Sequence, residues 1–147
     1  MKIAIVSGKA EGPTKLNSFD NALLDAGIGN VNLIKVSSML EKNTKIIELP
    51  LLKPGSMINC VLSSISSNEK GNLISAAVAV AIGDNLGCVV ENSKINQDPE
   101  EVQTEAIAMV KYMMEVRGET IHELIVEEVN HLVEKIGTVI ASVVYLN

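Results

Sequence analysis

The sequence predicts an α+β fold, a layered αββα-type sandwich of mainly antiparallel strands with two or three helices. Three observations lead to this prediction: strand-like runs outnumber helical patterns, the connections are short, and 47% of the 147 residues are hydrophobic. So much apolar surface suits a sheet that is buried on both faces or a sizeable interface between subunits. At this length a single domain spanning residues 1–147 is expected.

Strand-like segments are short, apolar and rich in β-branched residues. They lie at residues 2–6, 31–37, 57–66, 73–82, 86–92, 123–129 and 137–146. The first is expected to end at Ser7-Gly8, with Gly8 as a turn residue. Residues 39–56 are expected to be irregular apart from a short strand at 45–49, because Pro50 and Pro54 interrupt regular structure.

A short helix is predicted between the first two strands. Asn17 or Ser18 is expected to cap it, since either side chain can accept a hydrogen bond from the first free amides. The helix should run through Asp25, because Gly27 stops it and Gly29 reinforces the stop.

A second, longer helix is predicted to start after Asp98. Asp98 is a good N-cap, Pro99 suits the first helical position, and Glu101 can complete a capping box. Gly118 should end this helix. Its apolar residues recur at helical spacing and should face the core: Val102, Ala106, Met109, Val110 and Met113.

Composition argues against several classes of partner. The net charge is −6, Arg117 is the only arginine and aromatic residues make up 2% of the chain, so no nucleic-acid partner is expected. Every long apolar run is interrupted by polar residues, so no membrane partner is expected. Cys60 and Cys88 sit in apolar runs and should be reduced, buried thiols of a cytoplasmic protein.

Familiar site motifs are missing. The glycines after the first strand lack the spacing of a phosphate-binding loop. His122 and His131 have no carboxylate or thiol at ligand spacing, so no metal is expected. No GxSxG motif pairs a serine with either histidine.

The serine pair Ser37–Ser38 is distinguished by its neighbours. Two other Ser-Ser pairs occur, at 63–64 and 66–67, but only this one follows GPTKLNSFDNALLDAGIGNVNLIKV. That frame resembles the segment before the self-cleavage site of the pyruvoyl-dependent arginine decarboxylases. The resemblance continues in GNLISAAVAVAIG at 71–83 and in GCVVEN at 87–92.

The chemistry implied by this resemblance starts at the bond between the two serines. The Ser38 hydroxyl would attack the Ser37 carbonyl on a strained chain, with an amide of Asn32 or Asn30 stabilising the oxyanion. Elimination and hydrolysis would leave fragments 1–37 and 38–147, with a pyruvoyl group as residue 38. Its ketone would form a Schiff base with the substrate amine and withdraw electrons as carbon dioxide leaves.

The resemblance also implies roles for single residues. Ser37 and Ser38 match the cleavage pair, and Asn32 matches an asparagine implicated in self-processing. Asp20 matches an acid that pairs with the substrate guanidinium, which suits a bidentate charge-assisted hydrogen bond. Glu91 matches the active-site glutamate that protonates the product, and burial after an apolar run would keep it able to donate near neutrality.

The expected activity is conversion of arginine to agmatine and carbon dioxide for polyamine synthesis. The resemblance implies a homotrimer of cleaved units or a hexamer, with active sites shared between neighbours. Alternatives remain: another amino acid as substrate, or a non-cleaving, non-catalytic oligomeric homologue. Met39-Leu40-Glu41-Lys42 stands where family members commonly carry prolines, and residues 56–70 also depart from the family. Gly55-Ser56 offers the pair at which aspartate decarboxylases cleave, without the flanking frame.

Overall fold

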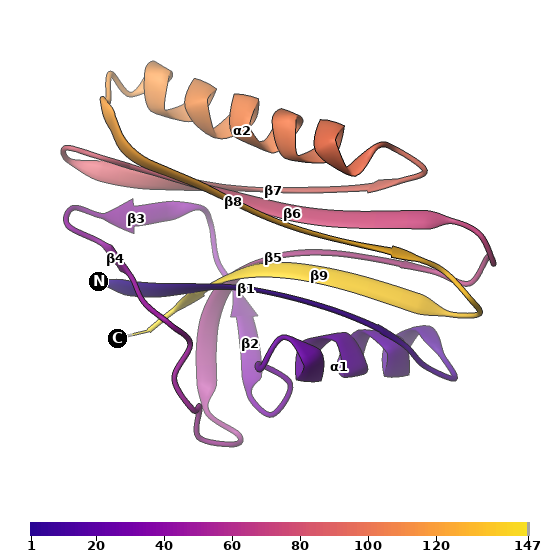
Figure 1. The fold of residues 1–147 in the computed structure, drawn as a ribbon. Coiled ribbons are helices and arrows are strands. Elements are labelled where there is room, and N and C mark those ends of the chain that lie inside the picture. The colour runs from indigo at the N-terminus through magenta and orange to yellow at the C-terminus, as the bar shows by residue number, and fades with distance from the viewer. Residues whose placement is uncertain (147) are drawn as a thin grey trace.

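The computed structural model describes residues 1–146 as four layers, in the order helix, sheet, sheet, helix (Figure 1). The predicted αββα sandwich is therefore confirmed. The elements are β1 (Lys2–Glu11), α1 (Lys15–Asp25), β2 (Asn32–Lys35), β3 (Met39–Glu41), β4 (Lys45–Ile46), β5 (Met57–Ser67), β6 (Leu73–Gly83), β7 (Leu86–Ile95), α2 (Pro99–Val116), β8 (Ile121–Leu132) and β9 (Gly137–Tyr145).

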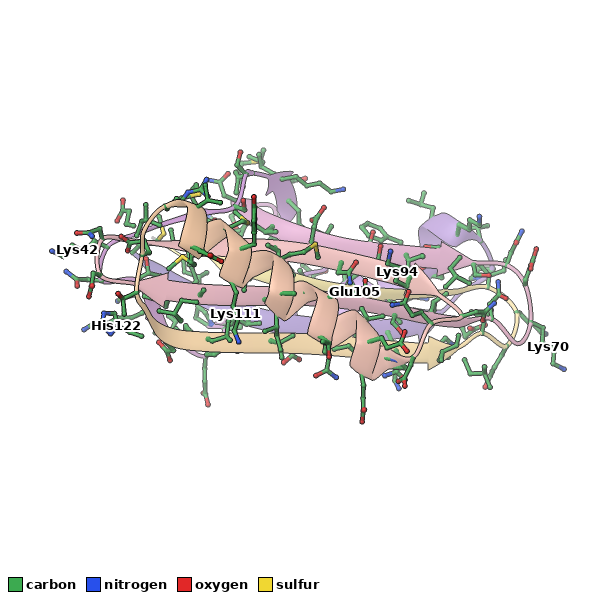
Figure 2. All side chains as sticks on the ribbon, turned by 90° about the horizontal axis from the view of Figure 1, so that it is seen from above. Lys42, Lys70, Lys94, Glu105, Lys111 and His122 are labelled. Carbon is green, nitrogen blue, oxygen red and sulfur yellow. The ribbon has the colours of Figure 1, made fainter. Side chains whose placement is uncertain are left out.

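The strands form two sheets that face each other. The five-stranded sheet has the order β2-β5-β9-β1-β4, and the four-stranded sheet has the order β3-β7-β6-β8. The pairs β1–β4 and β2–β5 are parallel, whereas the other pairs are antiparallel. Helix α1 covers the outer face of the five-stranded sheet, and α2 crosses the outer face of the four-stranded sheet (Figures 1 and 2).

The apolar core is divided among the three interfaces between layers. Strand β6 shows how the sequence fills two of them, because successive side chains point to opposite faces. Val78 and Val80 lie between the sheets, whereas Ala77, Ala79 and Ala81 contact the layer of α2. The small alanines let the helix approach closely, and all eleven residues of β6 except Leu73 are buried. The expectation of a sheet buried on both faces holds for this strand.

The start of the chain differs from the prediction in two ways. Strand β1 continues past Ser7 to Glu11, because Gly8 serves close packing and not a turn. A Cβ atom at Gly8 would lie 2.3 Å from the carbonyl oxygen of Ala22 in α1. The helix is capped by Thr14, whose side chain accepts from the Asn17 amide, so the predicted caps at Asn17 and Ser18 are wrong.

Helix α2 follows the prediction closely. The Asp98 side chain accepts from the Glu100 amide at 3.0 Å, and Pro99 occupies the first helical position. Val102, Ala106 and Val110 are buried against the sheet, as their spacing indicated. No helix within residues 1–146 is long and apolar enough to cross a membrane.

Candidate functional site

The two serines lie where the chain crosses from one sheet to the other. Residues 36–38, here called the crossing segment, connect β2 of the five-stranded sheet to β3 of the four-stranded sheet (Figure 1). The Val36 amide donates to the Cys60 carbonyl at 2.9 Å, and the Val89 amide donates to the Ser38 carbonyl at 2.8 Å. Each sheet thus holds one end of the segment, and the Ser37–Ser38 bond lies between the two anchors.

The backbone of the crossing segment shows no left-handed residue. Positive φ angles at non-glycine residues within 1–146 occur at Asn43 and Asn96. The strain expected for self-cleavage is therefore not expressed in the φ angle of either serine. The crossing segment is distinguished instead by its connection of two sheets, each of which holds one of its ends by a hydrogen bond.

A cavity of about 720 Å³ opens beside the crossing segment. Ser37 and Ser38 line it together with Glu91, three residues predicted for the site from sequence. Ser37 is exposed and Ser38 is half-buried, so both are accessible from solvent. The remaining walls are mostly apolar and come from Val36 of the crossing segment and from β5, β7 and α2: Val61, Val89, Val90, Ala108, Met109, Tyr112 and Met113.

Glu91 is exposed, although Val89 and Val90 before it are buried. The expectation that Glu91 is buried is thus wrong for the single chain, because β3 covers the edge of β7 only along residues 86–88. Glu91 also lines a second cavity of about 340 Å³ together with Lys35 and Ser63. It therefore borders an apolar cavity on one side and a polar one on the other.

Asn32 and Asp20 do not line the cavity that contains the serines. The Asn32 amide group donates to the Gly55 carbonyl at 3.0 Å, which ties it to the turn before β5. Asp20 is exposed on α1, on the opposite side of the five-stranded sheet from the cavity. Within one chain, the structure brings together the serines and Glu91 but neither of these two residues.

The side chains that α2 gives to the cavity were not recognised from sequence. Met109, Tyr112 and Met113 line it, whereas helical spacing assigned the two methionines to the core. Tyr112 is 67% exposed. In the sequence, an apolar stripe on a helix has the same spacing whether it contacts a sheet or borders a cavity. The one sign of the cavity was that the apolar stripe of α2 is wider than contact with a single sheet requires.

Other reactive side chains are engaged elsewhere. Burial raises the pKa of the Cys60 and Cys88 thiols, which makes both poor nucleophiles near neutral pH. His122 contacts the Asp84 carboxylate, and His131 contacts that of Glu11. Neither histidine lines the cavity.

Comparison with known proteins identifies relatives of this chain. The family described as pyruvoyl-dependent arginine decarboxylase matches residues 2–147. The chain belongs to this family. A pyruvoyl-dependent arginine decarboxylase from Methanothermobacter thermautotrophicus is 67% identical over 147 residues, which are 100% of this chain and 97% of the relative. One from Methanocaldococcus jannaschii is 38% identical over 144 residues, 95% of this chain and 86% of the relative.

The fold also resembles that of a solved pyruvoyl-dependent histidine decarboxylase at pH 8. The TM-score is 0.56 at 16% identity, over 66% of this chain and 53% of that one. At such identity the likeness concerns the fold alone. It agrees with the α+β sandwich of this chain.

The residues around Ser38 fit a pyruvoyl group at that position. Ser38 would supply the hydroxyl that formation of the group consumes, and the Val89 amide donates to the Ser38 carbonyl. The cavity beside it leaves room for a substrate with an aliphatic stem. The covalent pyruvoyl cofactor of this family thus has a site in the chain itself.

Proposed function

We propose that the chain cleaves itself between Ser37 and Ser38 and then decarboxylates arginine to agmatine. The observation that carries this proposal is the cavity that Ser37, Ser38 and Glu91 share at the crossing segment. Both the bond to be cut and the predicted proton donor lie on its wall.

Cleavage with formation of the pyruvoyl group consumes one water molecule and releases one ammonia molecule. The Ser38 Oγ attacks the Ser37 carbonyl carbon, its proton passes to the departing amide nitrogen, and the C–N bond is exchanged for an ester. Loss of the Ser38 α-proton then expels the Ser37 carboxylate and leaves dehydroalanine. Water adds to the tautomeric imine, ammonia leaves, and residue 38 becomes a pyruvoyl group.

The folded structure is suited to hold the two fragments together after cleavage. Fragment 1–37 contains β1, which lies between β9 and β4 in the five-stranded sheet. Its nine paired positions with β9 run from Ile3 to Glu11. Fragment 38–147 keeps the Val89–Ser38 hydrogen bond. Each fragment is thus anchored independently of the bond that is cut.

The cavity walls and Glu91 supply the protein's part of decarboxylation. A pyruvoyl group at position 38 would supply the electron sink for the departing carbon dioxide. Apolar walls from Val61, Val89 and Met113 favour loss of the charged carboxylate as a neutral gas. Glu91 then protonates the product carbon and regains a proton through the polar cavity that it also borders.

Asp20 lies away from the cavity of its own chain, so contact with a substrate there would require another copy of the chain. Its position on the outer face, away from its own cavity, supports a site shared between neighbours. We propose a homotrimer of cleaved units, or a hexamer, in which Asp20 of one copy binds the arginine guanidinium in the next. We further propose a cytoplasmic location, because Cys60 and Cys88 are buried free thiols typical of reducing compartments.

Denaturing mass spectrometry of the purified protein tests this proposal. The expected result is two fragments, 1–37 and 38–147, whose masses add to that of the chain plus water minus ammonia. Ser38→Ala should stay intact and release no carbon dioxide from arginine. Ser66→Ala, in another Ser-Ser pair and outside both cavities, should behave like the parent. A parent chain that stays intact after long incubation would instead support a non-cleaving homologue, and turnover of a different amino acid would overturn the substrate assignment.

A further inference from the structure

The hydroxyl of Tyr145 contacts the residue that follows the cleavage pair. It donates to the Met39 carbonyl at 3.0 Å. Tyr145 ends β9 in the five-stranded sheet, whereas Met39 begins β3 in the four-stranded sheet. The hydrogen bond therefore links the two sheets one residue after Ser38.

This contact completes a set of anchors around the reactive bond. The Val36 amide holds the segment to the five-stranded sheet before the serines, and the Val89 amide holds the Ser38 carbonyl to the four-stranded sheet. Tyr145 then ties the next carbonyl, that of Met39, back to the first sheet. With two successive carbonyls held from opposite sheets, the peptide plane after Ser38 cannot swing freely. The Cα of Ser38, and with it the direction of the Cα–Cβ bond that carries the hydroxyl, is restrained.

The environment of Tyr145 keeps it in place as a donor. Its ring is half-buried and packs against the core between the sheets, so packing sets the position of the hydroxyl. Burial, and to a smaller extent the nearby Cys60, raises the pKa of Tyr145. The phenol therefore stays protonated and able to donate across the neutral range.

We propose that Tyr145 is a positioning residue for self-cleavage, whose hydroxyl holds the Met39 carbonyl so that the Ser38 hydroxyl stays within reach of the Ser37 carbonyl. This inference rests on the proposed cleavage at Ser37–Ser38. It assigns to the C-terminal strand a part in forming the cofactor, through a hydrogen bond between residues 106 positions apart.

The test compares Tyr145→Phe with a matched variant of the same strand. Tyr145→Phe keeps the ring and removes the hydroxyl, and should slow cleavage about five- to tenfold, as expected for one neutral hydrogen bond lost from the reactive geometry. Ser142→Ala removes another β9 hydroxyl, which donates to the Val61 carbonyl at 2.8 Å and not to a residue of the crossing segment. Cleavage of Ser142→Ala should follow the parental time course.

Melting temperatures measured in a Ser38→Ala background separate positioning from general loosening, since those chains cannot cleave. Tyr145→Phe should lower the melting temperature no more than Ser142→Ala does, while only Tyr145→Phe slows cleavage. The positioning role is overturned if Tyr145→Phe cleaves at the parental rate, or if Ser142→Ala slows cleavage as much as Tyr145→Phe does. Either result leaves the proposed function intact. An uncleaved parent would overturn the proposed function and this inference with it.

Discussion

The carboxylate of Glu11 should stabilise the turn between β8 and β9. It accepts hydrogen bonds from the Lys135 amide at 2.8 Å, the Ile136 amide at 3.0 Å and the Glu134 amide at 3.2 Å. The same carboxylate contacts the His131 ring at 2.7 Å, and the Glu11 side chain is 27% exposed. Hydrogen bonds to charged groups contribute about 1.5–3 kcal/mol each, but amides at this partly exposed turn can bond to water instead. We therefore expect Glu11→Ala to cost roughly 2–3 kcal/mol of unfolding free energy at pH 7.

The pH dependence of this stabilisation follows from the pKa of Glu11. Partial burial by itself would raise that pKa, but the hydrogen bonds from His131 and the three amides outweigh burial and lower it. The unfolded chain then binds the proton more tightly than the folded chain. The contribution is fully present above the ordinary pKa of 4.5 and is lost as the pH falls through the lowered folded value.

Urea unfolding at pH 7 and in acid, in the Ser38→Ala background, measures this effect on one uncut chain. The gap between that parent and Glu11→Ala should be wide at pH 7 and narrow as the pH falls below 4.5. Glu48→Ala is the control, because Glu48 is exposed on a loop. The reasoning is refuted if Glu11→Ala costs no more than Glu48→Ala at pH 7, or if the gap stays constant in acid.

Three further predictions concern the proposed enzyme. Glu91→Gln should cleave normally but decarboxylate arginine about a hundredfold or more slowly, because the proton donor is lost; unchanged turnover would remove Glu91 from the mechanism. Asp20→Asn should raise the KM for arginine and leave cleavage intact, measured by carbon dioxide release and mass spectrometry, whereas loss of cleavage would indicate a structural role. After cleavage, the two fragments should migrate together in native gel filtration and separate only in denaturant, since β1 stays paired with β9; separation in native buffer would contradict the retention argument.

Local patterns predicted those elements whose cause is local. Asp98 and Pro99 start α2 as expected, because a cap and a first-turn proline act within one turn of helix. The predicted strand end at Gly8 was wrong, because a glycine is needed at this position to avoid a clash with the carbonyl oxygen of Ala22, which lies far along the chain. Glu91 was expected to be buried from the valines before it, yet its exposure depends on how far β3 extends along β7.

The sequence by itself determined the family and the αββα class and predicted which serine pair is cut, because these rest on residue types in a continuous frame. Only the tertiary structure decided that Ser37 and Ser38 lie between two sheets and line a cavity with Glu91 but not with Asp20. Tertiary structure also decided that Tyr145 holds Met39. Such contacts join residues far apart in the chain, and the register of two sheets, not any local pattern, sets which of them meet.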